Sequence, residues 1–148
     1  MLTRRTAIGF IAAAPFITRP ALAASPEIYA EDGVALRGTD PVAYFTKGIV
    51  EKGTNDLPTV WRGATWHFSN PLHLTAFENE PEAYAPQYGG YCAYAVSKGG
   101  IATTDPNAWT IHNEKLYLNF SLTVRDIWSE DIPGNIAKAD ANWPAVLS

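Results

Sequence analysis

The sequence predicts a small single domain of the α+β class, built from short antiparallel strands and short helices. Three observations support this fold class. Beyond an N-terminal segment of 23 residues, the remaining 125 of the 148 residues suit one domain, with no linker or repeat dividing them. Strand-like and helix-like segments are short, and they do not follow the regular alternation of βαβ units. Glycine and proline, 11 of each, separate these segments.

Residues 1–23 have the features of an export signal. Arg4 and Arg5 precede an apolar run over 7–17, and residues 21–23 (Ala-Leu-Ala) have the small-x-small form of a signal-peptidase site. The paired arginines resemble those of a twin-arginine signal. A membrane anchor is the alternative, but this run is too short to span a bilayer. We therefore expect cleavage after residue 23 and a soluble exported domain over 24–148, periplasmic in a Gram-negative bacterium, with no membrane contact after cleavage.

The charge of the mature chain argues against two classes of partner. Three of the 11 Lys and Arg residues lie in 1–23, together with none of the 15 Asp and Glu residues, so cleavage changes the formal charge from −4 to −7. An acidic domain repels nucleic acid and anionic lipid. The sequence therefore predicts no nucleic-acid partner and leaves a metal ion, a small ligand or a protein as the expected partners.

The first half of the domain contains a predicted hairpin. Residues 60–68 form two strand-like pieces around Gly63. In the second piece Trp66 and Phe68 share one face, which we expect to be the core side, so His67 faces the opposite side. Residues 42–45 are apolar but too few to distinguish a strand from a helical turn.

A clear helix start follows this hairpin. Ser69 or Asn70 can cap the helix, and Pro71 occupies the first helical position, where a missing N–H costs nothing. The helix is expected to continue to Glu78, and residues 81–84 form a further single turn. Gly89 and Gly90 then allow a turn with positive φ and a close approach of two backbone segments.

The second half combines strands with helices. Residues 91–96 are expected to form a strand with Cys92 and Tyr94 on one face. A hairpin is expected over 109–120, turning at Asn113-Glu114. A helix capped by Ser121 is expected to continue to Asp131. Its inward face is expected to consist of Leu122, Val124, Ile127 and Trp128. Pro133 should break the helix there, and a last helix is expected over 136–141.

The single cysteine, Cys92, limits the chemistry of the chain. An exported protein with one cysteine has no internal disulfide, so its stability must come from packing. Three roles remain open for Cys92: a buried and inert thiol, a thiol paired with another chain, or a metal ligand.

Several segments together resemble the YHS domain family, and the chain is similar to small exported bacterial proteins of this family. The resemblance covers most of the mature chain. The segments that carry it are residues 40–45 (DPVAYF), 66–69 (WHFS), 76–77 (AF), 81–84 (PEAY), 88–93 (YGGYCA), 109–119, 132–134 (IPG) and 139–144 (ADANWP).

The resemblance implies a YHS-like α+β fold and a link to metals, because YHS domains are metal-associated modules found in copper-transporting ATPases and elsewhere. The metal-binding pattern of related folds has three cysteines, and the positions that match them here are Ala43, Ser69 and His73. A cage of three thiolates therefore cannot form. His73 and Cys92 remain as candidate ligands.

We therefore expect a binding module rather than an enzyme, with Cys92 and His73 as ligands for copper or another soft transition metal. His67, His112 or a tyrosine is a candidate third ligand. Three alternatives remain open. His73 and Cys92 are ordinary helix and core residues, or the domain binds a metal-free ligand or a protein. In the third alternative, Cys92 and a histidine form the catalytic pair of a thiol enzyme. The aromatic residues Tyr84, Tyr88, Tyr91, Tyr94, Trp66 and Trp109 either fill the core or line a pocket.

Overall fold

The computed structural model describes residues 24–148, so the predicted export signal at 1–23 lies outside the described residues. The α+β class is confirmed. Within 24–148, no helix is long and apolar enough to cross a membrane. The strands are β1 (Ala30–Glu31), β2 (Val34–Ala35), β3 (Thr54–Trp61), β4 (Ala64–Phe68), β5 (Trp109–His112) and β6 (Lys115–Leu118); the helices are α1 (Pro41–Thr46), α2 (Pro71–Asn79), α3 (Pro81–Tyr84), α4 (Ala93–Ser97), α5 (Leu122–Ser129) and α6 (Ile132–Asn142).

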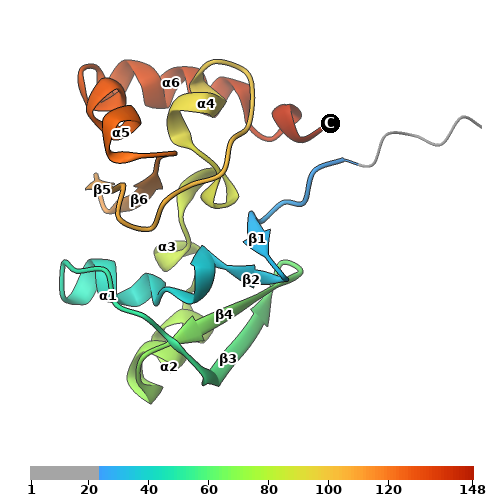
Figure 1. The fold of residues 1–148 in the computed structure, drawn as a ribbon, viewed down its shortest axis with the longest axis vertical. Helices are drawn as coiled ribbons and strands as arrows, with labels where there is room; N and C mark the ends of the chain where they lie inside the picture. The colour runs from blue at the N-terminus through green and yellow to red at the C-terminus, as the bar shows by residue number, and fades with distance from the viewer. Residues whose placement is uncertain (1–23) are drawn as a thin grey trace, which may run out of the picture.

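The first half of the molecule is built on a four-stranded sheet with the order β1-β2-β4-β3 (Figure 1). Strands β2 and β4 pair in parallel, and the other neighbours are antiparallel. The predicted β3–β4 hairpin is confirmed. Its turn residues Arg62 and Gly63 both have positive φ, 49° and 79°, which matches the right-handed twist of the two strands.

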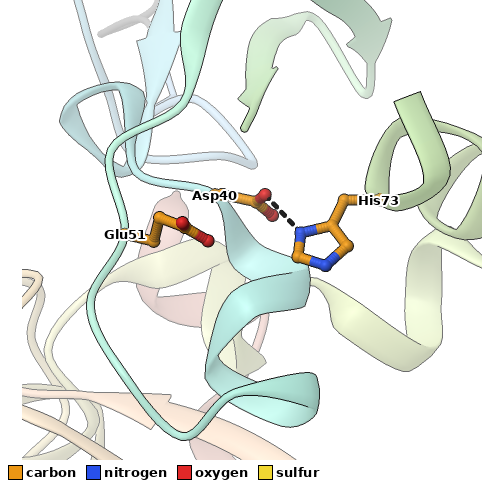
Figure 2. Close-up of side chains that lie close together, drawn as sticks. All are labelled: Asp40, Glu51 and His73. Atoms are coloured by element: carbon orange, nitrogen blue, oxygen red, sulfur yellow. Dashed lines mark hydrogen bonds and ion pairs between the residues drawn. The ribbon is translucent and has the colours of Figure 1, made fainter. Parts of the chain in front are cut away.

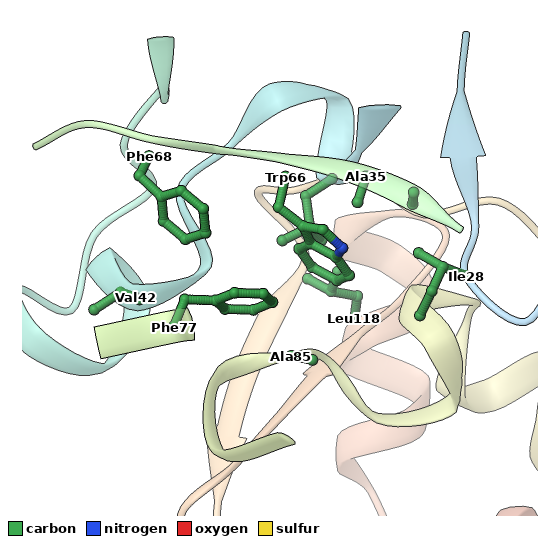
Figure 3. Close-up of a cluster of buried hydrophobic side chains, with 10 residues drawn as sticks. Ile28, Ala35, Val42, Trp66, Phe68, Phe77, Ala85 and Leu118 are labelled. Atoms are coloured by element: carbon green, nitrogen blue, oxygen red, sulfur yellow. The ribbon is translucent and has the colours of Figure 1, made fainter. Parts of the chain in front are cut away.

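A first core lies between this sheet and α2. Trp66 and Phe68 are fully buried, as their alternation with His67 predicts, and both rings pack against Phe77 of α2 at centroid distances of 5.0 and 5.1 Å (Figure 3). The predicted α2 start is also confirmed, because the Asn70 side chain accepts a hydrogen bond from the backbone N–H of His73 at 2.9 Å. The first core thus fixes the position of α2 against the sheet.

A second core fills the C-terminal half, where α4, α5 and α6 lie together beside the β5–β6 hairpin (Figure 1). Strand β6 joins the two cores. Tyr117 packs into the second core against Trp128 with a centroid distance of 5.4 Å, whereas the next residue, Leu118, belongs to the first core. Successive side chains of a strand point to opposite faces, so one strand serves both halves.

Two backbone predictions for the middle of the chain have different outcomes. The glycine turn is confirmed: Gly89 and Gly90 have φ of 62° and 84°, and a side chain at Gly89 would collide with the carbonyl oxygen of Glu27. The strand predicted over 91–96 is wrong, because Ala93–Ser97 is the helix α4. A distant side chain stabilises the start of this helix: Asn119 accepts a hydrogen bond from the Tyr94 backbone N–H at 3.1 Å.

The other helices differ in smaller ways from what the sequence predicts. The ambiguous residues 42–45 belong to α1. Pro133 lies in the first turn of α6 rather than in a break, because Asp131 caps this helix by accepting a hydrogen bond from Gly134 at 3.0 Å. Ser121 caps α5 as predicted, and Trp128 is buried, but Leu122 and Ile127 are 51% and 41% exposed. Only part of the apolar face of α5 therefore meets the core.

Candidate functional site

Asp40 caps helix α1. One oxygen of its carboxylate, Oδ1, accepts hydrogen bonds from the backbone N–H groups of Val42 and Ala43, at 2.9 and 3.3 Å. Pro41 occupies the first position of the helix, where its lack of an N–H is harmless. Asp40 is fully buried, so its carboxylate depends on protein groups to replace water.

The other oxygen of Asp40, Oδ2, connects α1 to α2. It accepts hydrogen bonds from the backbone N–H and the hydroxyl of Ser69, at 2.9 and 2.7 Å, and it lies 2.6 Å from Nδ1 of His73 (Figure 2). Because an ionised carboxylate only accepts hydrogen bonds, we assign the Nδ1 proton to His73. Five donors thus converge on one buried carboxylate.

His73 is the third residue of α2 and lies almost entirely inside the protein, with 9% of its surface exposed. Its second ring nitrogen, Nε2, lies 3.3 Å from the hydroxyl of Thr46 at the end of α1. The single proton of that hydroxyl points either to Nε2 or to the backbone oxygen of Val42, which lies 3.1 Å away. Both ring nitrogens therefore have a polar neighbour, and the contact with Asp40 is the shorter one.

Glu51 completes the group from the loop that follows α1 (Figure 2). The backbone oxygen of Glu51 accepts a hydrogen bond from Asp40 N at 2.8 Å, which brings the two residues side by side. Lys47 lies 2.9 and 3.0 Å from the two carboxylate oxygens of Glu51, and this contact lowers the Glu51 pKa below its ordinary value. Asp40, Glu51 and His73 each offer a ligand-type atom, and these atoms lie within 4.8 Å of one another.

The hydroxyl of Ser69 lies at the centre of this group. Its oxygen is 2.7 Å from Asp40 Oδ2, 3.1 Å from Glu51 Oε2 and 3.4 Å from His73 Nδ1. A hydroxyl has one proton to donate, so it satisfies only one of the two carboxylates. The other oxygen–oxygen contact has no proton between its atoms. One further positive charge at this point would balance the group.

Cys92 lies in a different environment, immediately before α4. The side chain is buried, and its sulfur accepts a hydrogen bond from the Phe120 backbone N–H at 3.3 Å. The thiol also donates to the side-chain oxygen of Asn119 at 3.5 Å. These neutral groups pair with both the donor and the acceptor of the thiol, which links α4 to the segment after β6.

The structure does not bring the predicted ligands Cys92 and His73 together. They have no hydrogen-bonding partner in common, and α4 and α2 lie toward opposite ends of the molecule (Figure 1). The other histidines, His67 on β4 and His112 on β5, are half-buried and do not belong to the Asp40–Glu51–His73 group.

Sequence reasoning missed Asp40 and Glu51 as site residues. A signal existed for Asp40, because an aspartate directly before a proline is a good helix cap, and a cap is a carboxylate held in a fixed place. No local signal marks Glu51, whose position depends on how the loop after α1 returns to Asp40.

Comparison with known proteins adds no relative: no family model, no curated protein and no solved structure matches the chain. The resemblance to YHS domains therefore stays a prediction based on the segments quoted above. The arguments about function that follow depend on the geometry of the site.

Proposed function

We propose that this protein is an exported, non-catalytic binding module for a divalent transition-metal ion, with Asp40, Glu51 and His73 as the ligands. The observation that carries the proposal is the shortage of positive charge at Ser69. Two carboxylates meet one hydroxyl proton there, at 2.7 and 3.1 Å. A metal ion bound by the three side chains would supply the missing charge.

The donor set indicates which metals are favoured. One imidazole nitrogen and two carboxylate oxygens suit divalent ions of intermediate softness, and among these the Irving–Williams order places Cu²⁺ first. The expected copper would then be bound in its divalent form. A soft Cu(I) site like that of the cysteine-based relatives does not fit, because the only thiol in the chain is buried against Asn119 and Phe120.

Metal binding would change the tautomer of His73. Nδ1 lies 2.6 Å from Asp40, and a metal bound at Nδ1 requires that the ring proton be on Nε2, where the Thr46 hydroxyl 3.3 Å away can accept it. Glu51 must also give up part of its contact with Lys47, whose ammonium lies 2.9 Å away. Protons compete with the metal for the imidazole and the two carboxylates, so we expect tighter binding as pH rises.

The test is a calorimetric titration of residues 24–148 with Zn²⁺ and with Cu²⁺ in a buffer that does not bind metal. We expect one ion per chain and a nitrogen hyperfine pattern in the Cu²⁺ electron paramagnetic resonance spectrum. His73→Ala should weaken binding at least about 10-fold, since it removes the only nitrogen ligand, and Glu51→Gln should weaken it by a similar factor.

His112→Ala is the matched control, because it removes an imidazole outside the group and should leave the affinity unchanged. Equal affinities for the wild type and His73→Ala would overturn the proposal. The alternative, a metal-free interaction domain on a YHS-like scaffold, then gains support from the surface clefts described next.

A further inference from the structure

Two clefts on the surface share part of their lining. Their volumes are about 520 and 620 Å³, within the range of ligand sites, and both are lined by Glu82, Gln87 and Lys115. Because they share these residues beside α3, we call the combined feature the α3 groove. None of Asp40, Glu51 and His73 lines it, although Thr46, whose hydroxyl lies 3.3 Å from His73 Nε2, lines the second cleft.

Aromatic side chains line the groove on both sides of the shared residues. Trp61 and Trp143 line the first cleft, and Phe45 and Tyr84 line the second. All four are only partly buried, so part of each ring is available to a ligand. Phe45 and Tyr84 are fixed edge to face with centroids 5.5 Å apart, which prepares one aromatic surface in advance.

The charges of the groove are largely paired within the protein. Arg62 lies 3.3 Å from Glu27 and 2.6 Å from Glu82, and its guanidinium covers the Trp61 ring at 4.3 Å. Asp140 accepts a hydrogen bond from the Tyr88 hydroxyl at 2.8 Å. These contacts occupy Arg62 within the protein, so the net charge of the groove depends on its excess of acidic over basic side chains.

The unpaired groups of the groove are polar and of mixed sign. Lys115 and its neighbour Glu114 carry opposite charges, and neither has an ion-pair partner among residues 24–148. Gln87 and Asn113 add two amides, each able to donate and to accept hydrogen bonds. The excess of acidic side chains in the groove repels anions. The four acidic residues are Glu27, Glu82, Glu114 and Asp140, and the two basic residues are Arg62 and Lys115.

We infer that the α3 groove binds an uncharged oligosaccharide. A sugar ring has an apolar C–H face, which matches the exposed parts of Trp143, Phe45 and Tyr84. Its hydroxyls both donate and accept, which matches the amides of Gln87 and Asn113. The two open clefts, which share Glu82, Gln87 and Lys115, suit a chain of several rings better than one compact molecule.

The experiment is an array of uncharged and anionic glycans probed with labelled residues 24–148 in the presence of EDTA, which removes any metal. We expect binding to uncharged glycans only. The best glycan is then titrated into ¹⁵N-labelled protein, and the shifted amide signals should cluster at 82–88 and 112–116. Binding of anionic glycans alone, no binding, or shifts elsewhere on the surface would each overturn the inference.

Two conservative variants show whether the groove itself is responsible. Gln87→Glu and Asn113→Asp each replace an amide donor by a carboxylate of the same shape, and aspartate tolerates the positive φ of 49° at position 113. Each should weaken glycan binding at least 5-fold without changing Tm. His73→Ala should retain full glycan binding, so failure of the metal proposal and failure of this inference give different results. Binding of an uncharged peptide with equal affinity would show a protein-docking surface instead.

Discussion

The two halves of the molecule each bury a polar group, and they differ in how that group is balanced. In the sheet half, Asp40 and His73 lie in a network that includes Glu51 and Lys47, so full charges meet around Ser69. In the helical half, Cys92 exchanges neutral hydrogen bonds with Asn119 and Phe120. Residue type alone made His73 and Cys92 equal candidates as ligands.

The comparison teaches that the balance of donors and acceptors, rather than residue type or burial, separates a candidate site from a structural contact. The Cys92 thiol has both of its hydrogen-bonding capacities used by neutral groups, and a metal there would leave the Phe120 N–H without its acceptor. The Ser69 hydroxyl, in contrast, has one proton for two carboxylates. Only the sheet half therefore gains from an added cation.

The largest expected effect comes from Asp40→Asn, which keeps the shape of the side chain and removes its charge. The variant presents an amide group to five hydrogen-bond donors, and it leaves the imidazole of His73 without its carboxylate partner. Removing one member of a buried pair typically costs about 3 to 5 kcal/mol, so we expect a loss of this size in the free energy of unfolding. Urea denaturation followed by tryptophan fluorescence measures it.

Asp131→Asn is the control for this prediction, since Asp131 is an exposed helix cap with one hydrogen bond to Gly134. Asparagine caps helices about as well as aspartate, so the loss there should stay below about 1 kcal/mol. Similar losses for the two variants would mean that Asp40 acts only as a helix cap, and the distinction between the halves would fail.

The elements of the sheet half could be predicted well from the sequence, because their signals are local. The alternation of Trp66, His67 and Phe68 predicts which side is buried, and Asn70-Pro71 marks the start of α2. The hairpin over 109–120 follows similarly from its own pattern of apolar residues. Such signals depend on residues that are neighbours in the chain.

The failures have a common physical cause, which is dependence on distant partners. Helix α4 starts where Asn119, 25 residues further along the chain, accepts the Tyr94 N–H. Glu51 joins the site because its backbone returns to Asp40. The pairing of Cys92 with His73 assumed that the turn at Gly89 and Gly90 brings Cys92 back to α2, whereas the segment after this turn forms α4 and packs into the second core.

A smaller effect is expected from Cys92→Ser, which tests the neutral half. The hydroxyl is smaller than the thiol and costs more to bury, so the free energy of unfolding should fall by about 1 to 2 kcal/mol. Metal affinity should not change, because Cys92 is outside the ligand group. In the wild type, iodoacetamide should modify the buried thiol only after denaturation; rapid alkylation of the folded protein would contradict this structural role and favour a reactive cysteine.

The smallest effect concerns pH, and one group from each half, Glu51 and Tyr88, should respond at opposite ends of the scale. Lys47 lowers the pKa of Glu51 below its ordinary value of 4.5, so this contact stabilises the protein above that pH and is lost as the pH falls. Burial, with the contact to Asp140, raises the pKa of Tyr88 above its ordinary value of 10.0. The stabilisation that this raised pKa of Tyr88 gives to the folded protein is present below pH 10 and is lost as the pH rises.

Thermal unfolding between pH 3.5 and 11 tests this contrast. Glu51→Gln should flatten only the acid side of the Tm profile, by about 3 °C or less because the Lys47–Glu51 pair is partly exposed. Tyr88→Phe should flatten only the alkaline side, since phenylalanine has no proton to lose. If either variant changed both sides equally, the charges of the two halves would be coupled, and the separation argued from their contacts would be wrong.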